Sequence, residues 1–137
     1  MRRGAAAFLI VAAVALGGCG GSNPREVDAK VTEPKGCVVR VFFASRMVTG
    51  RAATRHEVHA VRDRIASSSK VRTFAFVSKE LALKRMAKLH PVIARGLKTN
   101  PLPEAYEIVP RSASDADELV ADLSRARGVE HVSSKGC

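Results

Sequence analysis

The stretch from Val71 to Tyr106 most constrains what this chain can fold into, because its successive parts require different secondary structures. Its first seven residues, Val71–Val77, are rich in β-branched and aromatic side chains and predict a strand. Ser78 is a suitable N-cap, and apolar residues recur at helical spacing over residues 79–90. Pro91 must then end or kink this helix, because proline lacks the backbone N–H that an inner helical turn needs.

The second half of the stretch predicts a short helix over residues 92–97 and then a sharp change of direction. Asn100-Pro101-Leu102-Pro103 excludes regular structure, because each proline also restricts the residue before it. A new strand is expected from Ala105. We therefore expect a small helical insert, at about residues 79–103, between two strands.

Besides Val71–Val77, three strands are predicted from short runs of β-formers, and the strand that starts at Ala105 is one of them. The first has apolar residues on both faces and should be central in a sheet. The strand that starts at Ala105 contains Pro110 near its end, which favours an edge or a strand terminus. These strands are expected at Val38–Phe43, Ala105–Arg111 and Val129–Ser133.

Two longer helices are predicted outside the insert. Thr54 and Glu57 stand at the spacing of a capping box, so a helix should begin there, after a loop over residues 44–53. Ser114 is the expected N-cap of the last helix. Gly128 is its expected C′ residue, since glycine tolerates the left-handed conformation at helix ends.

The predicted order of elements indicates an α+β fold. Strand, helix, strand, helical insert, strand, helix, strand is the order of a ferredoxin-like split β-α-β antiparallel sheet. Two helices should cover one face of four strands. The unusual part is the small helical lobe inserted between strands 2 and 3.

Several short motifs in the same stretch resemble one bacterial family. Val77-Ser78-Lys79-Glu80, Ala82-Leu83, Arg85 and Asn100-Pro101-Leu102-Pro103 occur in the order and approximate spacing found in the extracellular domain of the cell-division protein FtsX. The resemblance runs from about Val38 to Val132. It implies an α/β lobe with a small helical lobe, in agreement with the fold expected from the residues themselves.

The first eighteen residues are typical of an export signal. Arg2 and Arg3 precede an uncharged apolar run, which is shorter than the roughly 20 residues that a membrane-spanning helix needs. The sequence Leu16-Gly17-Gly18-Cys19 resembles a lipobox, which implies cleavage before Cys19 and lipid attachment to its thiol. The alternatives are a short membrane anchor that stays attached, and a free cysteine after an ordinary signal peptide.

The next segment reads as a tether. Residues 20–36 are rich in glycine, proline and charge, and they lack an apolar period. We therefore expect a signal peptide at 1–18, the lipidated Cys19 with a flexible tether at 19–36, and a folded domain at 37–137.

The two remaining cysteines are predicted to pair. In a split fold of this kind the last strand lies antiparallel to the first, so the start of one is near the end of the other. Cys37 immediately precedes the first strand and Cys137 follows the last. A Cys37–Cys137 disulfide is expected in an exported, oxidising setting. The alternative is a frayed terminal thiol at Cys137.

Charge and composition narrow the classes of partner. The net charge is +10, and setting aside Arg2 and Arg3 leaves about +8, which favours anionic partners. The basic residues are dispersed and not interleaved with aromatics, so no nucleic acid is expected. No catalytic constellation, metal site or cofactor motif is present: His56-Glu57-Val58-His59 lacks the spacing of a zinc-binding pair. We expect a protein that is not an enzyme and needs no cofactor.

The insert is too short to bury all of its apolar residues. It therefore predicts an exposed apolar patch for a partner. The residues of this patch are Met86, Leu89, Val92, Ile93 and Leu97. The alternative is that they only close the lobe onto the sheet.

The FtsX resemblance implies a role for this lobe in recruiting peptidoglycan hydrolases, directly or through a coiled-coil adaptor. The leading hypothesis is thus a lipid-anchored, extracytoplasmic binding module for a cell-wall hydrolase, an adaptor or another cell-division or cell-wall partner. A lipoprotein that binds an anionic wall polymer or a small ligand through its basic surface is the alternative, and a small hydrolase is the third. FtsX itself spans the membrane several times and pairs with a cytoplasmic ATPase; since no spanning helix follows the leader, no ATPase partner is expected.

Overall fold

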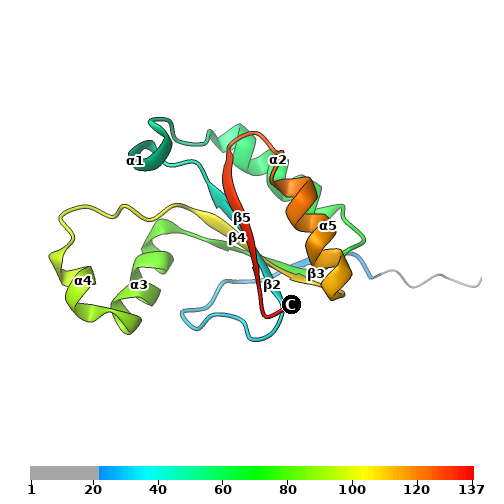
Figure 1. The fold of residues 1–137 in the computed structure, drawn as a ribbon, viewed down its shortest axis with the longest axis horizontal. Coiled ribbons are helices and arrows are strands. Elements are labelled where there is room, and N and C mark those ends of the chain that lie inside the picture. Colours follow the sequence, from blue (N-terminus) through cyan, green and yellow to red (C-terminus); the bar gives the residue numbers. More distant parts are fainter. Residues whose placement is uncertain (1–21) are drawn as a thin grey trace, which may run out of the picture.

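The computed structural model describes residues 22–137, which form one five-stranded sheet with helices on both sides (Figure 1). The strand order is β1-β3-β4-β2-β5. The four long strands are antiparallel to their neighbours, and only β1 is parallel to the strand beside it. The strands are β1 (Arg25–Glu26), β2 (Val38–Phe43), β3 (Val71–Val77), β4 (Ala105–Pro110) and β5 (Val129–Lys135).

The predicted position of the last strand is confirmed. β5 pairs antiparallel with β2, and Val41 lies opposite Val132. β2 is central, between β4 and β5, as its apolar residues on both faces indicated. Pro110 stands at the end of β4, a central strand, so proline here marks a terminus and not an edge.

Two helices pack on one face of the sheet and form the core with it. They are α2 (Arg55–Ala66) and α5 (Ala113–Leu123), and Figure 1 shows them on the same side. Alternate residues of β2 point toward them, as the period of two in a strand requires. The helix-facing core includes Val39, Val41, Phe43, Val58, Val61, Ile65, Phe74, Tyr106, Ile108, Ala116, Leu119 and Leu123.

The helix starts follow local capping chemistry, with one correction. The capping box is present at α2: the Glu57 backbone N–H donates to Thr54 Oγ1 at 3.2 Å, and the Thr54 N–H donates to the Glu57 carboxylate at 2.9 Å. The predicted cap of α5 at Ser114 is wrong. Ser112 is the N-cap, because its extended backbone lets its hydroxyl accept from the Asp115 N–H at 3.1 Å.

The predicted role of Gly128 is also wrong in detail. α5 ends at Leu123, and Ser124 is its C-cap, so Gly128 is not the C′ residue. Gly128 still has a positive φ of 80°, and an added Cβ would lie 2.8 Å from the Cβ of Glu57. The glycine is thus required by a tight turn against α2 and not by the end of a helix. The expected loop over residues 44–53 contains a short helix, α1 (Arg46–Thr49).

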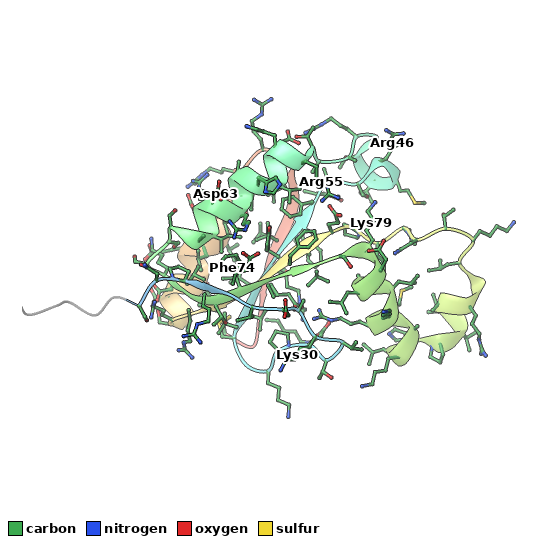
Figure 2. All side chains as sticks on the ribbon, turned by 180° about the vertical axis from the view of Figure 1, so that it is seen from behind. Lys30, Arg46, Arg55, Asp63, Phe74 and Lys79 are labelled. Atoms are coloured by element: carbon green, nitrogen blue, oxygen red, sulfur yellow. A yellow bond between two sulfur atoms is a disulfide. The ribbon has the colours of Figure 1, made fainter. Side chains whose placement is uncertain are left out.

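The flexible tether predicted over residues 19–36 is not what the described part of that segment shows. Residues 25–36, here called the strap, begin as β1 along the edge of β3, and the Val27 N–H donates to the Phe74 carbonyl at 2.8 Å. Arg62 on α2 also contacts β1: its Nε donates to the carboxylate of Glu26 at 3.0 Å. In Figure 2, Lys30 lies on the side of the sheet opposite α2. The composition of the strap does not predict this arrangement, because several of the contacts that hold the strap involve its backbone.

A disulfide joins Cys37 to Cys137, as predicted. It ties the end of the strap to the end of β5. Cys19 and the predicted signal peptide lie outside the described residues. Within residues 22–137, no helix is both long enough and apolar enough to cross a membrane.

The insert between β3 and β4 forms two short helices. They are α3 (Lys79–Leu89) and α4 (Pro91–Gly96), close to the predicted bounds. Figure 1 shows the pair projecting from the sheet, away from α2 and α5. Residues 79–103 are called the helical lobe below.

Candidate functional site

The helical lobe is built by strong local signals. The Ser78 hydroxyl accepts from the Leu81 N–H at 3.2 Å and begins α3. Pro91 occupies the first turn of α4, where a missing N–H costs nothing. α3 therefore ends at Leu89, and α4 starts in a new direction.

The Asn-Pro-Leu-Pro turn closes the lobe. The Asn100 side-chain amide donates to the Lys79 carbonyl at 2.7 Å, at the opposite end of the lobe sequence. Its carbonyl oxygen accepts from the Leu102 N–H at 3.1 Å. One side chain thus fixes both the returning chain and the start of α3, which explains an asparagine before the first proline.

A buried ion pair fastens α3 to the sheet. The Arg85 guanidinium contacts both carboxylate oxygens of Glu107 on β4, at 2.7 and 3.0 Å, and the two residues are only 7% and 5% exposed. Arg85 Nε also donates to the Lys30 carbonyl of the strap at 2.8 Å. Arg40 on β2 contacts Glu107 at 3.2 Å and Glu33 of the strap at 2.7 Å. The lobe, the sheet and the strap therefore meet at one charged cluster.

Sequence reasoning missed this cluster. In the sequence, Arg85 stands out only as part of a family motif, and Glu107 only as a residue of a predicted strand. A usable signal was present: Glu107 interrupts a strand that is otherwise mostly apolar, and a buried carboxylate needs a cationic partner. The partner itself could not be chosen, because several arginines and lysines precede it in the insert.

The apolar patch predicted on the lobe is largely exposed. Leu89, Val92 and Ile93 have exposed fractions of 66%, 72% and 59%, and we call these three the apolar ridge. Met86 and Leu97 are half-buried. Exposed aliphatic side chains this large on neighbouring helical turns have no evident role in holding the lobe closed.

A groove continues from the ridge toward the sheet. It has a volume of about 260 Å³ and lies between α3 and the face of the sheet opposite α2. Met86 and Leu89 form part of its wall, while Val92, Ile93 and Leu97 lie outside it. Phe42 and Leu102 add apolar surface, and the Arg85–Glu107 pair lies at its polar side. The arrangement can receive an apolar side chain with a polar neighbour.

Other candidate chemistry is not assembled in the described residues. Across residues 22–137, no three histidine, cysteine, aspartate or glutamate side chains lie close enough to hold a metal. His56 and His59 are exposed on α2. Non-enzymatic, cofactor-free function stays a prediction.

The sequence and the fold of this chain are both similar to those of known proteins. A family model described as the FtsX extracellular domain matches residues 37–136. The crystal structure of extracellular domain 1 of FtsX from Streptococcus pneumoniae in complex with undecyl-maltoside is similar, with a TM-score of 0.58 and 20% identity, covering 74% of this chain and 97% of that one.

The solution structure of the large extracellular loop of FtsX in Streptococcus pneumoniae is similar as well. Its TM-score is 0.57 at 20% identity, covering 72% of this chain and 98% of the other. No curated protein matches the sequence. At this identity the structural similarity establishes the fold.

Proposed function

The chain belongs to the FtsX extracellular domain family, and from this premise we propose that it is a membrane-anchored, extracytoplasmic binding module. Its helical lobe engages a peptidoglycan hydrolase, an adaptor or another cell-division or cell-wall partner. The observation that carries this proposal is the apolar ridge of Leu89, Val92 and Ile93, which continues into the groove beside α3. An exposed apolar surface of this kind is a site for association, because covering it removes apolar area from water.

The similar pneumococcal domain supports an apolar ligand on this fold. Its crystal structure is a complex with undecyl-maltoside, a detergent whose tail is an alkyl chain. In the present chain the ridge and groove offer the corresponding chemistry. Aliphatic side chains from a partner helix would meet Leu89 and Ile93, and Met86 would adapt to their shape.

Anchoring through Cys19 would present the lobe outward. β1 begins at Arg25, six residues after Cys19, and six extended residues span at most about 20 Å. Figure 1 shows the helical lobe at the end of the molecule far from β1. A lipid on Cys19 would thus hold the domain close to the membrane with the lobe directed away from it.

Capture of partners from envelope extract tests the proposal with a matched control. Ile93→Asp and Val92→Asp place a charge on the ridge, outside the groove and the charged cluster. Met47→Asp and Val48→Asp on α1 are the control, since these residues are as exposed, at 69% and 67%, but lie outside the lobe. We expect the ridge variants to lose capture of a wall hydrolase, adaptor or division protein identified by mass spectrometry.

Retained capture in the ridge variants would refute the proposal, as would equal loss in the α1 controls. Thermal unfolding of all four variants should match the unmodified protein, because every changed side chain is exposed. The expected lipid on Cys19 is read from the intact mass of protein extracted from membranes. An unmodified Cys19 would remove the anchor from the proposal and leave the binding surface.

A further inference from the structure

A cleft lies away from the helical lobe, between α2 and the turn that joins α5 to β5. Its volume is about 600 Å³, which is within the range of sites that hold small molecules or short chain segments. Figure 1 shows the α5–β5 turn beside the start of α2. The cleft is lined by Arg51, His56, Glu57, Arg64, Arg125 and Arg127, with small apolar residues between them.

The cleft is held in shape by contacts of Gly128 with the two segments beside it. Gly128 packs so closely on Glu57 that no side chain fits between them, which fixes the turn against the first turn of α2. The Gly128 carbonyl also accepts from the Ala44 N–H at 2.8 Å. The two walls therefore have a defined separation, and the arginines of the turn are carried on a rigid support.

The acidic groups near the cleft are already occupied. Both oxygens of Glu57 contact the Arg51 guanidinium, at 2.9 and 3.2 Å, and its pKa is lowered to about 2 by the hydrogen bond from Arg51 and by that from the Thr54 N–H. The Nε of Arg64 donates to the carboxylate of Asp122 at 2.8 Å. Each of these carboxylates is neutralised by its own arginine.

Two cations in the cleft wall have no such partner. Arg125 and Arg127 are exposed, and no acidic side chain of residues 22–137 lies within ion-pair distance of either. The amino-terminal end of α2 adds partial positive charge at the same place. The cleft therefore carries excess positive charge with unused guanidinium donors, which are the groups that match phosphate oxygens best.

The apolar part of the cleft lining indicates the rest of the ligand. It comes from Ala60, Val61 and Ala126, which are small or buried. Such a lining suits the C–H faces of a sugar or polyol, while the arginines suit its phosphates. A flat bilayer surface cannot enter a cleft, whereas a thin chain can.

From these contacts we infer that the cleft beside Arg125 and Arg127 is a binding site for a phosphate-bearing polyol or saccharide chain. The site is separate from the helical lobe and does not depend on the function proposed for it. The proposed site assigns the binding of anions to one place on the basic surface. The sequence alone shows only that basic residues are dispersed along the chain.

The test uses the full folded domain and a short fluorescein-labelled glycerol phosphate oligomer, with binding followed by fluorescence anisotropy at low salt. The variant Arg125→Gln/Arg127→Gln removes both free cations of the cleft. The control, Arg72→Gln/Arg95→Gln, removes two exposed arginines elsewhere that also lack an acidic partner within residues 22–137, so net charge falls equally. We expect affinity to fall about tenfold or more in the cleft variant, and less than about twofold in the control.

Equal loss in the two variants would overturn the inference, because it would show attraction to net charge alone. Absence of binding to the unmodified protein would overturn it too. A third arm uses vesicles of phosphatidylglycerol and phosphatidylcholine: binding to vesicles but not to the oligomer would assign the arginines to a lipid surface instead. Ile93→Asp should bind the oligomer normally, which separates this site from the helical lobe.

Discussion

Replacing Glu107 with glutamine tests how the helical lobe is held to the sheet. The change keeps the size of the side chain and removes its charge. Arg85, which is 7% exposed, then loses its only acidic contact within residues 22–137, and Arg40 keeps only Glu33. Breaking a buried ion pair from one side costs about 3–5 kcal/mol, because a charge remains buried without a partner. We expect about 3 kcal/mol, since Arg40 retains Glu33.

The opposite change should cost less, and the difference is the informative quantity. In Arg85→Met the carboxylate of Glu107 still contacts Arg40 at 3.2 Å, and methionine fills most of the same space. The loss is then that of hydrogen bonds to Glu107 and to the Lys30 carbonyl, about 2 kcal/mol. Combining Arg85→Met with Glu107→Leu should cost less than the sum of the single changes, because neither buried charge remains.

Urea unfolding followed by far-ultraviolet circular dichroism gives the free energy of unfolding of each variant. Hydrogen exchange should show lost protection in α3 and the strap before any loss in α2 and α5, because the pair joins those first two segments to the sheet. A cost below about 0.5 kcal/mol for Glu107→Gln would refute the reasoning, since that is the range of ordinary surface changes. So would a smaller cost for Glu107→Gln than for Arg85→Met.

Two further predictions concern the turn and cap beside the basic cleft. Gly128→Ala should destabilise the fold more than Gly50→Ala. Both glycines have a positive φ, at 80° and 75°, but of the two only the Cβ added at 128 meets another atom. Equal melting temperatures of the two variants would contradict this. Glu57→Gln should flatten the acid dependence of stability. The pKa of Glu57 is lowered from 4.5 to about 2 by Arg51 and the Thr54 N–H, so its contribution is present above pH 4.5 and lost as the pH falls toward 2. Glutamine still completes a capping box but does not titrate; parallel acid unfolding curves for the two proteins would count against this cause.

The elements that sequence reasoning placed well are those with a short-range cause. The strand at Val71–Val77 follows from its β-formers, and the start of α2 from the spacing of Thr54 and Glu57. The Cys37–Cys137 pairing needed one further step, the rule that places the last strand beside the first. The exposure of Leu89, Val92 and Ile93 follows because so small an insert cannot enclose all of its apolar side chains.

The elements that it missed depend on contacts between distant segments. The composition of the strap is that of a linker. Two of the contacts that hold it, the pairing with β3 and the hydrogen bond to the Lys30 carbonyl, involve the main chain, and such contacts leave little trace in the composition. The start of α5 was placed two residues late because Ser112 and Ser114 are both acceptable caps. Only the path of the chain out of β4 selects Ser112.

The sequence by itself predicted the four long strands, the helices α2, α3, α4 and α5, and the apolar residues of the insert, because each follows from a local pattern along the chain. It missed β1 and α1, and its motifs indicated the family only as a resemblance. The tertiary structure decided which charges meet. It brings Glu107 to Arg85, Lys30 to the same guanidinium, and the turn at Arg125 and Arg127 to the start of α2. The physical reason is that ion pairing depends on distance in space, and any of the many dispersed arginines and lysines would serve a carboxylate equally well until the fold fixes which one is near.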